Sequence, residues 1–178
     1  MDEIEIRHAE EKDLPLILTF IRELAEYEHL AGEVVATEEV LREWLFERRA
    51  AEVIFAETGG REIGFALFFG NFSTFLGRGG IYLEDLYVRE AYRGLGAGRA
   101  LLRELARLAL ARGCGRLEWA CLDWNRPSID FYLSLGARPM SDWTTYRTAG
   151  EILKSWRNRG IKRTGVLNGR RSFNMSVP

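Results

Sequence analysis

One segment constrains the fold more than any other: Gly94, Gly96 and Gly98 lie between an apolar stretch and a long amphipathic stretch. Residues 81–88 combine β-branched, aromatic and aliphatic side chains, which predicts a strand. The stretch that follows carries leucines and alanines at helical spacing as far as Gly113, which predicts a helix. The first amides of such a helix have no internal acceptor. A strand, a glycine turn and a helix in this order therefore suit the binding of a phosphate or pyrophosphate.

Two other glycine motifs that bind phosphate do not match this turn. The dinucleotide motif G-x-G-x-x-G needs a third glycine where this chain has Arg99. The P-loop needs G-x-x-x-x-G-K followed by Ser or Thr, which the chain lacks. The pattern present is R-x-x-G-x-G, formed by Arg93, Gly96 and Gly98. Taken alone, it fits a glycine-rich connection with solvated arginines about as well as an anion site.

The remaining sequence predicts one α/β domain over residues 1–158. Asp13 and Thr37 are each expected to cap a helix, and Pro127 is expected to open a helix that Gly136 closes. Residues 151–158 are a further helical candidate. The other predicted strands are 3–7, 53–57, 63–69, 116–122 and 144–148, with a loop at 71–80. This order predicts a central mixed, mostly antiparallel sheet flanked by helices.

Composition excludes several classes of protein. Hydrophobic residues make up 47% and charged residues 29%, which is typical of a globular domain. Five of the 25 basic residues lie in 159–178, which has no acid, so the rest of the chain has 20 basic and 26 acidic residues. We expect no nucleic-acid partner. We expect 159–178 to be a basic, flexible tail, with an anion-binding arm as the alternative.

The cysteines, histidines and apolar stretches of the sequence indicate the cellular compartment and the metal content to expect. Two cysteines, Cys114 and Cys121, form no disulfide framework, and we expect Cys121 to be structural rather than nucleophilic. The first five residues are acidic and lack an apolar run, and no stretch is long enough to span a bilayer. We therefore expect no signal peptide, and a cytoplasmic protein without a membrane partner. The two histidines, His8 and His29, lack metal-ligand spacing, and we expect no metal.

A second motif follows the strand predicted at 116–122. The segment from Trp124 to Tyr132 contains Asn125, Pro127 and Ser128, which favour the start of a helix. Its two adjacent aromatic residues, Phe131 and Tyr132, diverge around that helix. Alone, this segment is typical of a well-capped helix with two packing aromatic side chains.

Together, the two motifs are more specific. The combination resembles the cofactor-binding core of the GNAT N-acetyltransferase superfamily. Further segments make it similar to the spermidine/spermine (diamine) acetyltransferase family over residues 4–148. These segments are Tyr27-Glu28, Tyr82-Leu83-Glu84-Asp85, Tyr92-Arg93-Gly94 and Trp124-Asn125 with Pro127-Ser128 and Phe131-Tyr132. The family's acidic cluster after its second helix is reduced here to Asp142-Trp143.

The resemblance implies acetyl-CoA as co-substrate, bound in a V-shaped cleft between strands 81–88 and 116–122. The pantetheine would pair with the main chain of Leu86, Tyr87 and Val88. The pyrophosphate would lie on the turn of Arg93, Gly94, Leu95, Gly96, Ala97, Gly98 and Arg99. Asn125 and Ser128 would contact the cofactor arm.

The resemblance also implies direct transfer of the acetyl group to a neutral primary amine. Tyr132 would be the general acid near the sulfur, and Glu84 the general base, acting through water. Because a glutamate is a weak base unless its pKa is raised, we expect Glu84 to be partly desolvated. Glu84 and Asp85 are adjacent, so both can face one cleft only where a bulge breaks the strand alternation. We expect that bulge near Asp85–Tyr87.

The acceptor pocket is expected to contain Tyr27, Glu28, Glu84 and Asp85, whose carboxylates would hold the second ammonium of a diamine. The reduced acidic cluster weakens the case for long polyamines and leaves lysine-like or other small amines as alternatives. Two other functions stay open: a non-catalytic acyl-CoA-binding sensor, and a protein lysine or N-terminal acetyltransferase. The family commonly forms homodimers by exchanging C-terminal strands, a part that 144–148 could take.

Overall fold

The structure, a computed structural model, describes residues 3–158 of the 178. The chain forms two compact units, Met1–Ile129 and Asp130–Pro178. The basic tail expected at 159–178 lies outside the described residues.

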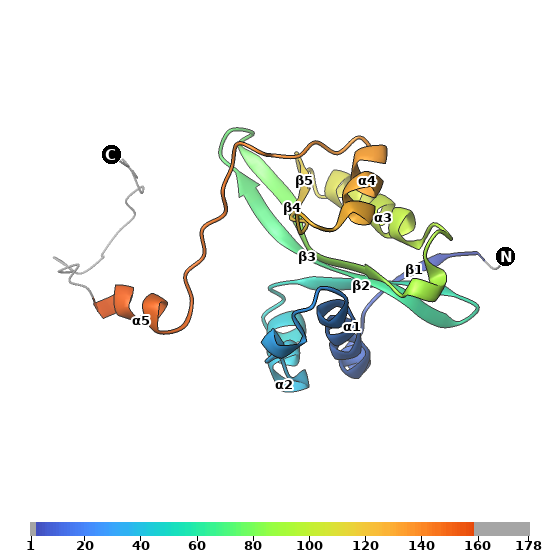
Figure 1. Cartoon of the computed structure of the whole chain (residues 1–178), viewed down its shortest axis with the longest axis horizontal. Coiled ribbons are helices and arrows are strands. Elements are labelled where there is room, and N and C mark those ends of the chain that lie inside the picture. Colours follow the sequence, from blue (N-terminus) through green and yellow to red (C-terminus); the bar gives the residue numbers. More distant parts are fainter. Residues whose placement is uncertain (1–2, 159–178) are drawn as a thin grey trace. The chain divides into compact units, whose positions relative to one another are not determined.

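The first unit is built on a five-stranded sheet in the order β1-β2-β3-β4-β5 (Figure 1). The first four strands are antiparallel neighbours, and β5 runs parallel to β4. The predicted mixed, mostly antiparallel sheet is therefore confirmed. The strands are β1 (Glu5–His8), β2 (Glu52–Thr58), β3 (Arg61–Ser73), β4 (Arg78–Val88) and β5 (Leu117–Trp119).

Helices cover both faces of this sheet. In Figure 1, α1 and α2 lie on one face and α3 lies on the other. The helices are α1 (Leu14–Tyr27), α2 (Glu38–Leu41), the π-helix η3 (Arg42–Glu47) that continues α2, α3 (Ala97–Ala111), α4 (Arg126–Ser134) and α5 (Gly150–Asn158). The predicted helices are confirmed, and α4 crosses the boundary between the two units.

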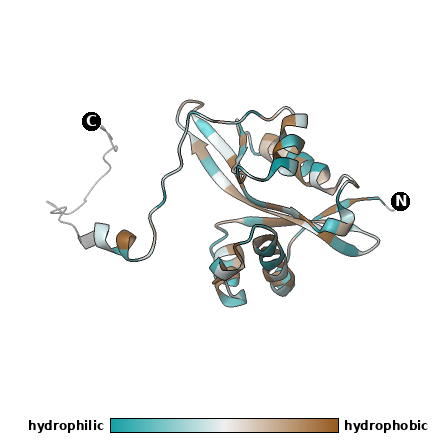
Figure 2. Cartoon of the chain, in the orientation of Figure 1, coloured by the Kyte–Doolittle hydropathy of each residue, from teal (hydrophilic) through white to brown (hydrophobic). Residues whose placement is uncertain are grey.

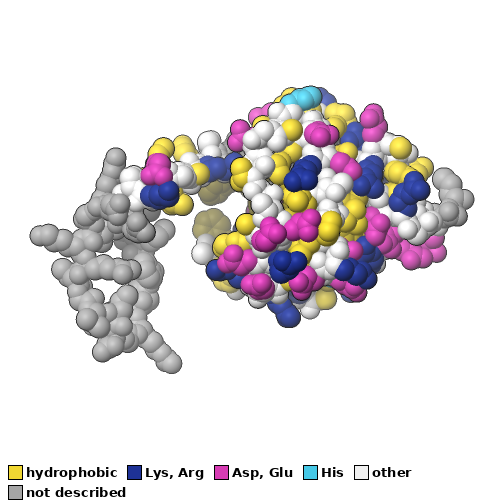
Figure 3. Space-filling model, turned by 90° about the horizontal axis from the view of Figure 1, so that it is seen from below, with side chains coloured by type: hydrophobic (Ala, Val, Ile, Leu, Met, Phe, Trp, Pro, Cys, Tyr) yellow, Lys and Arg dark blue, Asp and Glu magenta, His cyan; other side chains and the backbone are white. Residues whose placement is uncertain are grey.

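The core is apolar on both sides of the central strands. On the α1 face, the Phe20 ring packs 5.8 Å from the Phe55 ring and 5.2 Å from the Phe65 ring. Successive strand residues point to opposite faces, so Ile54 and Ala66 are buried on the α3 face. The hydrophobic colouring of the central strands in Figure 2 reflects this double burial. On the face that Figure 3 shows, acidic and basic side chains are interspersed.

The turn predicted between β2 and β3 is present, whereas the turn between β3 and β4 is shorter than predicted. Gly59 (φ 56°) and Gly60 (φ 72°) form the predicted β2–β3 turn, where a left-handed backbone is required. The predicted loop at 71–80 is wrong in extent: β3 and β4 continue into it and leave only 74–77 as the turn.

The two predicted helix caps differ in outcome. Thr37 caps α2 as expected, because its Oγ1 accepts a hydrogen bond from the Val40 amide at 3.3 Å. Asp13 stands at the N-cap position of α1, but its side chain makes no capping bond. Instead the carboxylate lies 2.7 Å from Arg7 Nη1 and accepts a bond from the Glu10 amide. The ion pair therefore replaces the predicted cap.

Two strand predictions near the C-terminus need correction. Only Leu117–Trp119 of the predicted strand 116–122 pairs, and the described residues 144–148 form no strand. Strand pairing needs a neighbour with free backbone groups, and local sequence does not say where one lies. In the second unit, Trp143, Tyr146, Ile152 and Trp156 are exposed.

Candidate active site

The end of β4 has a free edge. β4 pairs with β5 only at Ile81, Tyr82 and Leu83, and β5 then ends while β4 continues to Val88. The Arg89 amide donates to the Ile63 carbonyl on β3, at 3.0 Å. Because the polar groups of successive residues alternate in direction, the amides and carbonyls of Leu86 and Val88 face away from β3. This edge can pair with an extended ligand.

This alternation changes the role expected of Tyr87. Tyr87 lies opposite Phe65 in the antiparallel ladder, with its main chain directed toward β3. Leu86 and Val88 are therefore the residues whose main chain a pantetheine arm could reach. The ring of Tyr87 can contribute instead, since it lies 6.3 Å from the Tyr27 ring.

The glycine turn leads directly from this edge into α3. Gly94 (φ 79°) and Gly96 (φ 97°) adopt the left-handed conformation that other residues rarely take. Gly96 is the N-cap residue of α3, and no side chain caps the helix. A β-carbon built on Gly94 would meet nothing within 4 Å, so the turn presents open backbone. The first amides of α3 and its dipole therefore fit a pyrophosphate group.

A bulge interrupts β4 beside the free edge. Leu83 lies opposite Phe68 and Asp85 lies opposite Leu67, which leaves Glu84 as the extra residue. A bulge is present as expected, but it comes directly before the predicted segment. Glu84 is exposed, so the partial desolvation expected of it is wrong. Of these two adjacent acids, Asp85 is the half-buried one.

Three carboxylates interact in this region. Burial, with the charges of Glu84 and Glu28 acting in the same direction, raises the pKa of Asp85 to about 7. Burial also raises the pKa of Glu28. The three acidic residues expected in the acceptor pocket therefore influence one another. Among them, Asp85 has the pKa that is raised to about 7. A carboxyl group with a pKa near neutrality can accept and release a proton at physiological pH.

Cys121 borders the same acidic region. Burial raises the pKa of its thiol, and the charges of Glu28 and Asp123 act in the same direction. A thiol with a raised pKa is a poorer nucleophile at neutral pH because less of it is thiolate. This agrees with the structural role expected of Cys121, which is a free cysteine.

Tyr27 connects the free edge to the start of α4. Its ring lies 6.3 Å from that of Tyr87 and 6.2 Å from that of Trp124. Its hydroxyl donates to Asn125 Oδ1 at 3.2 Å. Asn125 is buried, and the same Oδ1 accepts from the Ser128 amide at 3.3 Å, so it caps α4 as predicted. The expected acceptor residue Tyr27 and the expected cofactor residues Asn125 and Ser128 are therefore neighbours.

Arg93 has contacts that the sequence did not predict. Its Nε donates to the Val88 carbonyl at 3.0 Å. Its guanidinium carbon lies 4.5 Å from the centre of the Tyr27 ring and 5.8 Å from that of Tyr87. Tyr27 lies 66 positions away in the chain, and no local pattern links the two residues.

Tyr132, the expected general acid, belongs to the second unit. It lies on α4, is half-buried, and its ring is 5.4 Å from that of Phe131. Its role beside a thioester stays a prediction.

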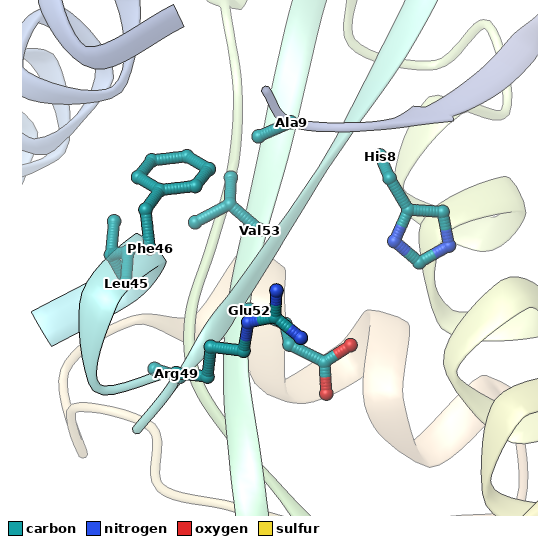
Figure 4. Close-up of a pocket in the computed structure, with 8 residues that line it drawn as sticks. His8, Ala9, Leu45, Phe46, Arg49, Glu52 and Val53 are labelled. Carbon is teal, nitrogen blue, oxygen red and sulfur yellow. The ribbon is translucent and has the colours of Figure 1, made fainter. Parts of the chain in front are cut away.

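A separate pocket of about 430 Å³ contains none of the residues expected at the site (Figure 4). Figure 4 shows Leu45, Phe46 and Val53 on one side and His8 on the other, with Arg49 and Glu52 between them. The carboxylate cluster and the glycine turn lie elsewhere, so the candidate site at β4 is separate from this pocket.

Within residues 3–158, no group of His, Cys, Asp and Glu is arranged to hold a metal ion. No helix of the same residues is long and apolar enough to cross a bilayer.

A free strand edge followed by an uncapped glycine turn fits the acyl-coenzyme A site that the resemblance implies. The model of the acetyltransferase (GNAT) family matches residues 18–137. The chain therefore belongs to the GNAT family, and it is an acetyltransferase.

Two relatives and one solved structure illustrate the similarity. The chain is 39% identical to thialysine N-epsilon-acetyltransferase of Sus scrofa, covering 86% of this chain and 97% of that protein. It is 34% identical to spermidine/spermine N(1)-acetyltransferase-like protein 1 of Homo sapiens, covering 86% of this chain and 24% of that protein. An integron cassette protein from the mobile metagenome of V. cholerae has a TM-score of 0.73 and 31% identity, covering 86% and 97%. The resemblance to the spermidine/spermine acetyltransferase family is thereby confirmed.

Proposed function

We propose that the protein transfers the acetyl group of acetyl-CoA directly to a primary amine of a small diamine, polyamine or lysine-like molecule. One observation carries this proposal. The free edge of β4 leads into an uncapped glycine turn, and a cluster of carboxylates borders the same strand. The first feature suits an acyl-CoA, and the second suits a cationic amine.

The residues that would hold acetyl-CoA follow from the main-chain groups that face away from β3 and from the start of α3. The main chain of Leu86 and Val88 would pair with the pantetheine arm. The pyrophosphate would lie on the amides from Gly94 to Arg99, with Asn125 and Ser128 near the arm. Bound there, acetyl-CoA supplies an acetyl group activated as a thioester.

The amine must lose a proton before it can attack. An alkylamine with a pKa of about 10.4 costs about 4.6 kcal/mol to deprotonate at pH 7. We propose Glu84 as the general base, acting through water, because the segment Leu83-Glu84-Asp85 matches the family's motif. Asp85 is a second candidate because its pKa of about 7 makes it a stronger base than an ordinary carboxylate.

The departing sulfur must gain a proton. We assign this step to the hydroxyl of Tyr132, which would donate its proton to the thiolate. Support for this role is the match of the segment from Trp124 to Tyr132 to the family's motif. Cys121 takes no part, because its raised pKa disfavours an acyl-cysteine route.

The substrate class follows from the charge of the acceptor region. Glu28, Glu84 and Asp85 together can hold a second ammonium group away from the reacting amine. Tyr27 directly precedes Glu28 in the chain, and its ring lies 6.3 Å from that of Tyr87, on the same strand as Glu84 and Asp85. Lysine-like amines are favoured over long polyamines, because only Asp142-Trp143 remains of the family's second acidic cluster. The pig relative named for thialysine, a lysine analogue, agrees with this preference. We place the reaction in the cytoplasm, where Cys114 and Cys121 would stay reduced.

The test is release of free thiol from acetyl-CoA with a panel of amines: short diamines, spermidine, lysine, thialysine and a monoamine. We expect turnover with the diamines and lysine-like amines and much less with the monoamine. Equal rates with the monoamine would contradict the assignment of Glu28, Glu84 and Asp85. Binding of CoA without thiol release on any amine would contradict the proposed transfer.

The same assay tests the general acid. Tyr132→Phe should lower kcat by about 10²–10³ because the thiolate would leave unprotonated, while the Kd for CoA stays within a few-fold. Phe131→Leu is the matched control on the same helix and should retain most activity. An unchanged kcat for Tyr132→Phe would remove Tyr132 from the mechanism.

A further inference from the structure

The side chain of Arg93 covers part of the free edge of β4. Its Nε donates to the Val88 carbonyl at 3.0 Å, and its guanidinium stacks on Tyr27 at 4.5 Å. The Val88 carbonyl faces away from β3, because the next amide, that of Arg89, bonds to β3. Arg93 therefore contacts one of the two main-chain positions that the free edge offers to an extended ligand.

This contact conflicts with strand-like pairing at Val88. A carbonyl oxygen can accept two hydrogen bonds, but the Arg93 side chain runs from this oxygen to the Tyr27 and Tyr87 rings. An arm that pairs with Val88 would have to share that space. Arg93 must move away, and it then loses a charge-assisted hydrogen bond and its stacking on Tyr27.

Because of its position in the chain, a displaced Arg93 side chain can form new hydrogen bonds that replace the lost contacts with Val88 and Tyr27. Arg93 directly precedes Gly94 and the uncapped start of α3. A guanidinium makes strong paired hydrogen bonds to phosphate oxygens. A ligand with a pyrophosphate on this turn can therefore give the displaced side chain a new partner. A ligand without phosphate cannot.

We propose that Arg93 determines the specificity for the acyl donor: its side chain covers the Val88 carbonyl, and only a pyrophosphate-bearing donor offsets its displacement. This inference rests on the proposed acetyl-CoA site. It predicts that Arg93 favours coenzyme A thioesters and disfavours acyl-pantetheine donors that lack the pyrophosphate.

Calorimetric titration with two probes, CoA and phosphate-free pantetheine, tests this inference. Arg93→Met keeps much of the side-chain length but removes the Nε donor and the charge. We expect Arg93→Met to bind pantetheine about tenfold more tightly than the wild type and CoA about tenfold more weakly, a change of about 1.4 kcal/mol in each direction. The opposite signs are the signature, since a general loss of structure would weaken both.

Two further variants separate the effect of the Arg93 charge from the effect of its side chain lying over the Val88 carbonyl. Arg93→Lys keeps the charge but loses the planar donor, so pantetheine binding should still tighten while CoA binding falls less. Arg99→Met is the matched control on the same turn. It should weaken CoA binding and leave pantetheine binding unchanged. Circular dichroism and thermal unfolding check that each variant is folded.

Failure of the inference and failure of the proposed function give different results. If the wild type binds CoA but Arg93→Met binds pantetheine no more tightly than the wild type does, the inference is wrong and the cofactor site stands. If the wild type binds no CoA, the proposed site itself is wrong.

Discussion

At the scale of single residues, Asp85 is the most perturbed carboxyl group of the candidate site. Its pKa is raised to about 7, first by burial and then by the charges of Glu84 and Glu28. Glu84 is instead exposed, because it is the extra residue of the bulge in β4. Glu84 and Asp85 are adjacent acidic residues that local sequence does not distinguish, yet one is exposed and the other is half-buried.

This environment makes a prediction about stability. The pKa of Asp85 is higher in the folded chain than the ordinary carboxyl value of 3.8, so the folded state favours the protonated form. Its contribution to stability is complete below about pH 4 and is lost as the pH rises through about 7. Asp85→Asn should raise the free energy of unfolding by about 1–3 kcal/mol at pH 8 and by less at pH 5.

Urea unfolding at the two pH values measures the effect. Asp123→Asn, at an exposed position, is the control and should change little at either pH. An equal effect of Asp85→Asn at pH 5 and pH 8 would show that Asp85 does not titrate in this range.

Glu28 supplies part of the perturbation of Asp85. Removing its charge with Glu28→Gln should lower the pKa of Asp85, because a neighbouring negative charge disfavours ionisation. If Asp85 acts as the base, kcat/KM falls as the pH drops below about 7 in the wild type. In the variant this fall should begin at a lower pH.

The measurement is the pH profile of thiol release with a good amine from the panel. Glu26→Gln changes an exposed residue two positions earlier, on α1, and should leave the profile in place. A profile that Glu28→Gln does not move would argue that Asp85 is not the titrating base.

At the scale of secondary-structure elements, the join between β4 and α3 determines where a donor can bind. β5 ends at Trp119, so within residues 3–158 no strand pairs with the last residues of β4 on that side. The left-handed backbone at Gly94 and Gly96 then turns the chain into α3 without a side-chain cap. The free edge and the free amides are consecutive in the chain, which suits a ligand with an extended arm and a charged end.

Gly96→Ala tests this join. A β-carbon at position 96 would lie 4.0 Å from Ile4 Cδ1, so space is available and the cost comes from φ 97°. We expect a loss of about 1–2 kcal/mol in the free energy of unfolding and weaker CoA binding, because the backbone would relax. Gly98→Ala is the control, since Gly98 lies within α3 and has no left-handed backbone. Equal stability of Gly96→Ala and the wild type, by urea unfolding, would contradict this account.

At the scale of the whole molecule, the second unit leaves large apolar side chains without cover in the described chain. Trp143 is 71% exposed and Tyr146 is 92% exposed, and residues 144–148 form no strand. Clustered apolar exposure of this kind marks interaction surfaces. We propose that a second copy of the chain covers them, by exchange of the segment 144–148, to give a homodimer.

Sedimentation at micromolar concentration measures this association. The wild type should sediment as two chains, and the double variant Trp143→Ser with Tyr146→Ser should shift to one chain because the apolar contact is lost. Trp44→Ser, at a half-exposed tryptophan of the first unit, is the control and should stay dimeric. A monomeric wild type would contradict the homodimer.

Local sequence determined the turns, one helix cap and the amphipathic helices of this protein. The glycine turn, the cap at Thr37, the Gly59–Gly60 hairpin and the amphipathic helices follow from backbone conformation and side-chain spacing over a few residues. The motifs also indicated the family, and the structure gathered Tyr27, Asn125 and Ser128 as neighbours.

Only the tertiary structure decided which carboxylate is buried, which main-chain groups are free and what Arg93 contacts. The bulge depends on the register of β3 against β4, and the free edge depends on where β5 ends. The contact of Arg93 with Tyr27 joins residues 66 positions apart. These features depend on pairing between distant segments, whose geometry is set by how the whole sheet packs and not by any stretch of neighbouring residues.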